Sequence, residues 1–96
     1  MQDLIQNIST RCFVISGEVQ GVFFRDNTKE VANRLRILGS AINQSDGTVK
    51  VIAKGDQDSL QQLFNWLLIG PRLAHVDDVK EVDINQYLQL NEFIIY

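Results

Sequence analysis

The chain has 96 residues, of which 45% are hydrophobic and 22% are charged, which is typical of one small globular domain with a single core. Nine lysines and arginines oppose twelve aspartates and glutamates, and this net charge of -3, without a basic run, argues against nucleic-acid and anionic-membrane partners. A single cysteine and a single histidine exclude an internal disulfide and, by the usual ligand counts, a closed zinc site.

The first ten residues, MQDLIQNIST, carry no basic segment and no long apolar segment, so they do not predict a secretory signal. No apolar run in the chain approaches the length of a membrane span. We therefore expect a cytoplasmic protein. We assign residues 1–10 to an N-terminal tail and residues 11–96 to one domain.

A strand followed by a helix opens the domain. The segment RCFVIS, Arg11 to Ser16, is rich in β-branched and aromatic residues and is stopped by Gly17, which predicts a strand. Apolar residues then recur at three- and four-residue spacing, which predicts an amphipathic helix that ends near Gly39. Its apolar positions are Phe24, Thr28, Val31, Leu35 and Leu38.

A hairpin is predicted next, over SAINQSDGTVKVIAK, with Asp46-Gly47 in the turn. In its second strand small or branched apolar residues alternate with Lys50, Ile52 and Lys54, so we expect one face to be wet or only partly covered.

The second helix is predicted to begin at a cap formed by Asp56 or Asp58 and to end at Gly70-Pro71. Its apolar stripe consists of Leu60, Leu63, Phe64, Leu67 and Leu68.

Two more strands are predicted, over AHVDDVKEVDI and over the closing EFIIY. The order is β-α-β-β-α-β with a short extra C-terminal strand, which predicts an α+β fold, the ferredoxin-like α/β sandwich. We expect an antiparallel sheet with both helices on one face.

The loop GEVQGVFFR, residues 17–25, leads from the first strand into the first helix. Gly17 and Gly21 permit positive φ angles, which would turn several N–H groups toward one point at a helix N-terminus and favour an anion. Arg25, on the first helical turn, can offer two hydrogen-bond donors to a phosphate. Spacing alone equally allows a tight connection followed by a solvated arginine, and Walker A and dinucleotide fingerprints are absent.

Three segments together resemble the acylphosphatase family: GEVQGVFFR, GSAINQSDGTVKV and GPRLAHV. The family pattern runs G-x-V-Q-G-V-x-F-R, then G-x-x-x-N with a D/G turn and a T-V strand, then G-P followed by a small residue and valine. The match runs in order from Cys12 to Tyr96. The resemblance implies an acylphosphatase-like domain over residues 11–96, which hydrolyses acyl phosphates to carboxylate and inorganic phosphate.

The resemblance also implies roles for individual residues. Arg25 corresponds to the arginine that binds the substrate phosphate, and Asn43 corresponds to the asparagine that orients the attacking water. The preceding loop corresponds to the backbone cradle for the phosphate oxygens. The implied phosphate-binding set is Glu18, Val19, Gln20, Gly21, Val22, Phe23, Phe24 and Arg25. On spacing alone, Asn43 would be a turn residue beside the hairpin.

Three departures from the family pattern carry expectations. Phe23 stands where many members have glycine, though phenylalanine also occurs there, and we expect it to alter the stiffness of the loop rather than the chemistry. Glu18 stands where a basic residue is common, and its carboxylate is expected to weaken attraction of an anionic substrate. Ser40 and Ala41 occupy places that are often filled by an aromatic and a larger aliphatic residue, so we expect the packing beside Asn43 to differ from that pattern.

The expected mechanism uses neither a metal nor a cofactor. Hydrolysis of an acyl phosphate needs positioning and charge stabilisation more than covalent chemistry, because the leaving group is already good. No Ser/His/Asp or Cys/His set is evident, since Cys12 is predicted in the core and His75 at the surface. A phosphate oxygen of the substrate is the expected proton acceptor.

The alternative function is a noncatalytic ferredoxin-like module that binds acyl phosphate or carbamoyl phosphate, since this fold hosts many activities. An RNA-binding module would need exposed aromatics and a basic surface, and a metal chaperone would need paired cysteines. We expect a monomeric enzyme that acts on a small acyl phosphate, without a nucleic-acid or membrane partner.

Overall fold

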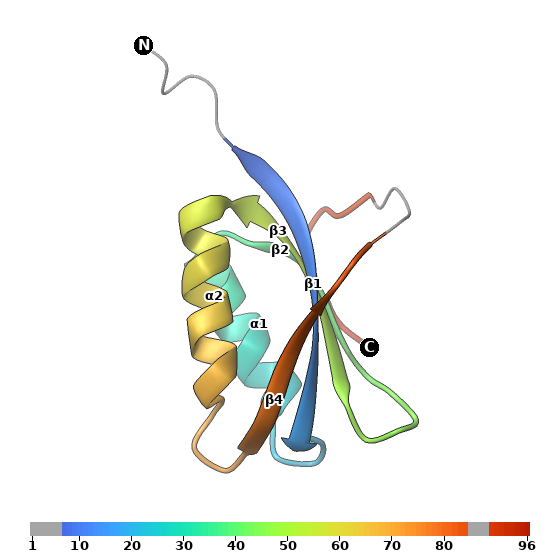
Figure 1. The fold of residues 1–96 in the computed structure, drawn as a ribbon. Coiled ribbons are helices and arrows are strands. Elements are labelled where there is room, and N and C mark those ends of the chain that lie inside the picture. Colours follow the sequence, from blue (N-terminus) through green and yellow to red (C-terminus); the bar gives the residue numbers. More distant parts are fainter. Residues whose placement is uncertain (1–6, 85–88) are drawn as a thin grey trace.

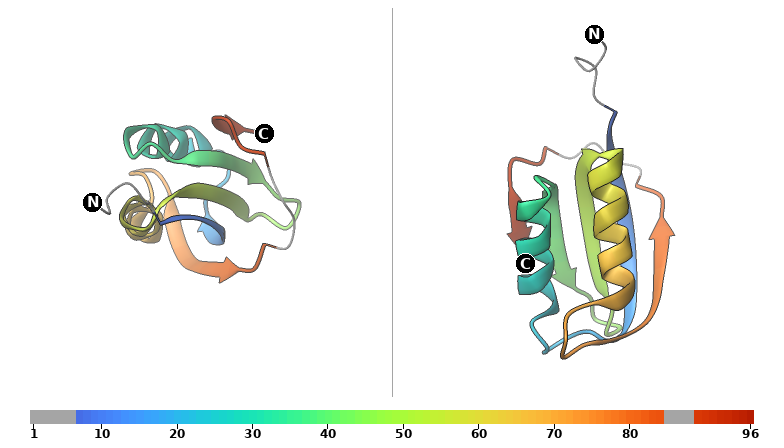
Figure 2. Two further views of the ribbon diagram at one scale, coloured as in Figure 1. Left: turned by 90° about the horizontal axis from the view of Figure 1, so that it is seen from above. Right: turned by 90° about the vertical axis from the view of Figure 1, so that its left-hand side faces the viewer.

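The structure, a computed structural model, describes residues 7–84 and 89–96. The strands it describes lie in the order β4-β1-β3-β2-β5, and both helices pack on one face of the sheet (Figures 1 and 2). This arrangement confirms the predicted α+β, ferredoxin-like fold. The elements are β1 (Ile8–Glu18), α1 (Phe24–Arg34), β2 (Leu38–Asn43), β3 (Val49–Asp56), α2 (Gln57–Ile69), β4 (His75–Val82) and β5 (Phe93–Ile95).

The sheet is mixed rather than wholly antiparallel as predicted. β1 pairs antiparallel with β3 and β4, and β2 pairs antiparallel with β3. β5 lies at the opposite edge from β4 and runs parallel to β2, with Ala41 opposite Ile95. The chain therefore crosses the sheet between β4 and β5, which makes a parallel pairing possible.

β1 is longer at both ends than the sequence predicts. Ile8 pairs with Asp56, so the last three residues of the segment assigned to the tail belong to the sheet. Residues 1–6 lie outside the described part of the chain. Gly17 does not stop the strand, because a bulge between Ser16 and Gly17 lets pairing with β4 continue to Glu18.

α1 ends at Arg34, earlier than the predicted end near Gly39. Arg36 takes a left-handed conformation (φ 60°), and its N–H donates to the Asn33 carbonyl at 3.1 Å. The N–H of Ile37 donates to the Ala32 carbonyl at 2.8 Å, which completes a Schellman motif. The buried Ile37 then leads directly into β2, so Leu38 lies in the sheet rather than in the helix.

The hairpin, the second helix and the closing strand follow the predictions closely. β2 and β3 flank the turn at Asp46-Gly47. Asp56 caps α2, because its carboxylate accepts a hydrogen bond from the Ser59 N–H at 2.7 Å. β4 and β5 lie inside the two segments predicted as strands.

The hydrophobic core lies between the two helices and the sheet face that they cover (Figure 2). In β3, Val49, Val51 and Ala53 are buried in this core, while the alternate residues are only partly covered, as predicted. Cys12 is also buried, and this burial raises the pKa of its thiol. Further core residues are Phe13, Ile15, Val19, Phe24, Val31, Ala32, Ile37, Ala41, Leu60, Leu63, Leu67 and Phe93.

An ion pair joins β1 to β4 at the margin of the core. Arg11 donates from Nε and Nη2 to the two carboxylate oxygens of Glu81, at 3.0 and 2.8 Å. The guanidinium also lies over the rings of Phe13 and Phe64, with its Cζ 5.0 and 5.6 Å from their centroids. The hydrogen bonds from Arg11 hold the pKa of the Glu81 carboxyl below its ordinary value.

This lowered pKa makes the contribution of Glu81 to stability dependent on pH. The contribution is fully present above the ordinary value of 4.5 and is lost as the pH falls through the lower pKa of the folded state. At pH 7 we expect Glu81→Gln to reduce the free energy of unfolding by about 0.5–1 kcal/mol, the scale of a partly exposed pair. Urea unfolding across pH 2–7 would measure this, with Glu30→Gln as the control. A difference that persists at the lowest pH would contradict the ion pair as its cause.

Candidate functional site

Three connections gather at one end of the sheet, as two perpendicular views show (Figures 1 and 2). They are the β1–α1 loop over residues 19–23, the β2–β3 turn over residues 44–48 and the α2–β4 connection over residues 70–74. Residues separated along the chain thereby share one surface of the molecule.

The β1–α1 loop contains two residues in left-handed backbone conformations. Gly21 has φ 78°, and Phe23 has φ 62° and ψ 27°. The conformation of Phe23 costs about 1–2 kcal/mol for a residue with a Cβ atom. It is held by Asn27, whose backbone N–H and side-chain Nδ2 both donate to the Phe23 carbonyl, at 3.0 and 2.8 Å. The loop is therefore fixed in a shape suited to turning N–H groups toward one point.

The N-terminus of α1 has no side-chain cap, because Phe23 occupies the capping position. The N–H groups of the first helical turn consequently lack intrahelical acceptors and carry the positive end of the helix dipole. A cavity of about 210 Å³ opens beside this turn. It is lined by Val19, Gly21, Phe23, Phe24, Arg25 and Asp26. Such a cavity can accept an anion.

Arg25 is held at this cavity by a residue near the end of the described chain. Its Nη1 donates to the backbone carbonyl of Tyr96, 71 positions away in the sequence. The Tyr96 N–H in turn donates to the Ala41 carbonyl on β2, at 2.9 Å. The guanidinium is thus tied to the strand that ends at Asn43.

A second tie joins the loop to the β2–β3 turn. The Nε2 of Gln20 donates to the backbone carbonyls of Gln44 and Thr48, both at 2.8 Å. Both hydrogens of one amide nitrogen are used, and the two acceptors stand on either side of the turn. Gln20 therefore fixes the loop relative to the residue that follows Asn43.

The turn itself is closed by its own hydrogen bonds. The Gln44 N–H donates to the Thr48 carbonyl at 2.8 Å. The backbone N–H and the Oγ1 of Thr48 donate to Asp46 Oδ1, at 3.0 and 2.7 Å. These donors lower the pKa of the Asp46 carboxyl, so the turn keeps its charged acceptor at neutral pH.

Asn43, the last residue of β2, has a buried Oδ1 without a hydrogen-bond partner among the residues that the structure describes. Buried amide oxygens in folded proteins are almost always paired with protein or water. Asn43 lies at the end of the sheet where the three connections gather. Its unpaired oxygen can therefore accept a hydrogen bond from a small donor such as water.

The residues of the predicted cradle divide into two groups. Val19, Gly21, Phe23, Phe24 and Arg25 line the cavity, with the side chains of Val19 and Phe24 buried in the core. The other three residues of the predicted cradle, Glu18, Gln20 and Val22, lie beside the cavity without lining it.

Glu18 ends β1 opposite His75, Gln20 ties the turn, and Val22 faces a neighbouring groove. Asn43 does not line the cavity and is linked to it through Gln20 and Tyr96. His75 is exposed, as predicted, and its Nε2 lies 3.2 Å from Asp77 Oδ1.

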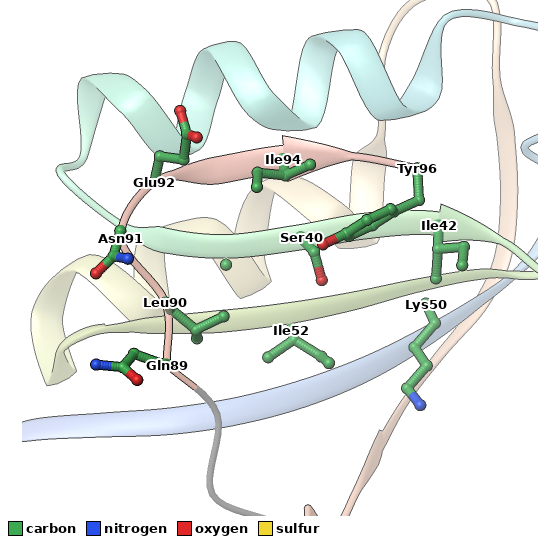
Figure 3. Close-up of a pocket in the computed structure, with 11 residues that line it drawn as sticks. Ser40, Ile42, Lys50, Ile52, Gln89, Leu90, Asn91, Glu92, Ile94 and Tyr96 are labelled. Atoms are coloured by element: carbon green, nitrogen blue, oxygen red, sulfur yellow. The ribbon is translucent and has the colours of Figure 1, made fainter.

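A separate hollow of about 430 Å³ lies on the sheet face away from the helices (Figure 3). The ring of Tyr96 lies over β2 there, near Ser40 and Ile42, while Lys50 and Ile52 face the same space from β3. This hollow contains neither Arg25 nor Asn43. It shares with the candidate site only Tyr96, whose backbone carbonyl holds Arg25.

Sequence reasoning missed three contributions to the site. Tyr96 accepts from Arg25 across the whole domain, and no local sequence signal marks such a contact. Thr48 contributes its backbone carbonyl, which accepts a hydrogen bond from Gln20, a residue that the sequence did assign to the cradle. Asp26 lines the cavity. Its position directly after Arg25, on the first helical turn, is the sequence feature that could have indicated this.

Across residues 7–84 and 89–96, no group of three His, Cys, Asp or Glu side chains is arranged to hold a metal ion. Neither of the two helices described has the length and apolar character needed to cross a membrane.

Comparison with known proteins gives one consistent family. A family model described as Acylphosphatase matches residues 11–95. An acylphosphatase of Hahella chejuensis is 50% identical over 66 residues, which are 69% of this chain and 70% of the relative. An acylphosphatase of Aliivibrio fischeri is 40% identical over 84 residues, which are 88% and 92%. The solved structure of an acylphosphatase from Coxiella burnetii superposes with a TM-score of 0.81 at 35% identity, over 94% of each chain.

The Gln20 tie leads to a prediction about stability. Gln20→Ala removes two hydrogen bonds, while the Thr48 and Gln44 carbonyls keep the N–H groups of Gln44 and Gly47 as donors. At about 0.5–1.5 kcal/mol for each bond, we expect the free energy of unfolding to fall by about 1–3 kcal/mol. Guanidinium unfolding would measure the loss, and Gln62→Ala, at an exposed glutamine of α2, is the matched control. Equal stability of the two variants would show that the tie carries no net energy.

Proposed function

The chain belongs to the acylphosphatase family, and we propose that Arg25 and the preceding loop bind the substrate phosphate while Asn43 orients the attacking water. The chain is accordingly an enzyme that hydrolyses acyl phosphates to carboxylate and inorganic phosphate. The observation that carries the proposed phosphate binding is the uncapped N-terminus of α1, which opens with Arg25 onto one cavity.

Phosphate binding is supported by the charges around the cavity. The left-handed residues Gly21 and Phe23 curl the loop, and the unpaired N–H groups of the first helical turn add partial positive charge. Arg25 adds a full charge and a planar pair of donors. In our proposal one phosphate oxygen displaces or joins the Tyr96 carbonyl at the guanidinium, which has further N–H groups to offer.

Water orientation is supported by the unpaired oxygen of Asn43. A water that donates to Asn43 Oδ1 would satisfy this buried acceptor and present its own lone pair to the phosphorus. The rigid turn and the Gln20 tie would hold that water at a fixed position relative to the cradle. Such positioning is the main contribution that the protein can make to this reaction.

The proposed reaction is an in-line displacement at phosphorus. The water oxygen forms a bond to phosphorus while the bond from phosphorus to the acyl oxygen breaks, and the carboxylate leaves with that electron pair. A proton of the water passes to a phosphate oxygen, which yields inorganic phosphate. Arg25 and the loop N–H groups stabilise the charge on the equatorial oxygens. A steep rate loss in Asp26→Asn would contradict this proton path and make Asp26 the base.

Paired variants test the two roles. We expect Arg25→Ala to abolish hydrolysis of benzoyl phosphate and inhibition by inorganic phosphate. Asn43→Ala should lower kcat by ~10²–10³ and leave that inhibition largely intact. Initial rates measured with EDTA present would provide both quantities, and the exposed Arg34→Ala and Asn33→Ala are matched controls on α1.

Each part of the proposal can fail separately in this assay. Normal turnover by Asn43→Ala would remove its role in orienting water. Activity that EDTA suppresses would contradict a metal-free mechanism. A folded wild type without turnover that still binds phosphate would instead support the noncatalytic module.

We also propose that the enzyme works as a monomer in the cytoplasm. The contacts of Gln20 and Arg25 that build the site lie within one chain. Sedimentation of the active protein should therefore give the mass of one chain, 10.9 kDa. A dimer that dissociates with loss of activity would overturn this.

A further inference from the structure

A groove of about 340 Å³ runs beside the phosphate cavity, between the β1–α1 loop and the α2–β4 connection. The two connections lie at the same end of the molecule (Figure 1). One wall of the groove is Val22, Phe23 and Asn27, and the other is Pro71, Arg72 and Leu73. Four of these six side chains are apolar, and Arg72 places a cation on the second wall.

Phe23 belongs to both spaces. It lines the groove and it also lines the cavity that contains Arg25. A molecule whose phosphate group occupies the cavity would therefore extend past Phe23 to reach the groove. The groove is continuous with the proposed phosphate site through this one side chain.

The ring of Phe23 is 65% exposed although its backbone is strained. Leu73, on the facing wall, is 66% exposed. An exposed apolar side chain alone is ordinary. Here, however, the same residue has a left-handed conformation that glycine would adopt without cost, and burial of the ring does not compensate for it. Such strain is characteristic of functional sites, where ligand contact gives the side chain its use.

The backbone that carries the ring is also fixed. Asn27 donates twice to the Phe23 carbonyl, and α1 begins at the next residue, so the loop cannot relax without breaking these bonds. An aromatic side chain on a held backbone has only two rotatable bonds, so it loses little conformational entropy on binding, which favours contact with a flat or bulky apolar group.

We propose that this groove binds the acyl group of the substrate and that Phe23 selects aromatic or bulky apolar acyl groups over acetyl. The inference rests on the proposed binding of phosphate at Arg25 and extends it to the other end of the substrate. An acetyl group ends at a single methyl and reaches little of the second wall. A benzoyl group places a ring against Phe23 and reaches toward Pro71 and Leu73.

The test compares two substrates in the same enzyme. The quantity measured is kcat/KM for benzoyl phosphate divided by kcat/KM for acetyl phosphate, because losses common to both substrates cancel in this ratio. We expect Phe23→Ala to lower the ratio by roughly 3- to 10-fold, the scale of one aromatic contact. Phe23→Tyr keeps the ring and should keep the ratio.

Variants of other apolar side chains show whether the groove is responsible. Leu73→Ala should lower the ratio in the same direction as Phe23→Ala, since it removes the facing wall. Leu68→Ala removes an exposed leucine of α2 that lines neither space, and it should leave the ratio unchanged. An unchanged ratio in Phe23→Ala would overturn the inference. Equal losses for both substrates would assign Phe23 to the shape of the loop alone.

Binding of non-hydrolysable analogues separates this inference from the proposed catalytic roles. Benzoylphosphonate and acetylphosphonate retain the acyl group and the anionic head, and calorimetry gives their affinities without turnover. A preference for benzoylphosphonate that Phe23→Ala removes supports the acyl groove even if Asn43 proves dispensable. Loss of both affinities in Arg25→Ala supports the phosphate site. No preference in the wild type refutes the groove and leaves the phosphate site standing.

Discussion

The amide of Gln20 is the interaction on which the geometry of the site depends. It joins a loop that follows β1 to the two ends of the β2–β3 turn, and it does so with a single nitrogen. Without it, the β1–α1 loop and Asn43 would be related only through the sheet and through the contact of Arg25 with Tyr96. The strands of a sheet allow small shifts and twists. A hydrogen-bonded side chain locks this relation at much finer precision, as catalysis requires.

The rest of the site depends on backbone conformation more than on reactive side chains. Two left-handed residues and an uncapped helix supply the polar surface, and Arg25 supplies a full positive charge at the phosphate cavity. A site with few reactive side chains suits a substrate with a good leaving group, because the reaction then needs mainly charge stabilisation and placement of the water. The free energy that the site costs the fold therefore comes from the left-handed backbone of the loop rather than from the burial of charged groups.

Local patterns predicted most of the fold. The Asp46-Gly47 turn and the Asp56 cap act through neighbouring backbone groups, so their effects are readable from a few residues. The predicted end of α1 was wrong, because Arg36, rather than a glycine, takes the left-handed conformation that follows the helix. For the site, the family motif indicated Arg25 and Asn43, whose roles stay predictions. The Tyr96 contact could not be foreseen, because it depends on how β5 crosses to the far edge of the sheet.

β5 is the shortest strand described, with three residues paired to β2 at the edge of the sheet. Edge segments with few contacts open more often than the strands between them, and they do so without global unfolding. Opening of β5 would break the Tyr96 link to Ala41 and release Arg25, while the remaining four strands stay paired. Gentle heating should then inactivate the enzyme before circular dichroism records a loss of fold, and amide hydrogens of β5 should exchange earliest among the strands.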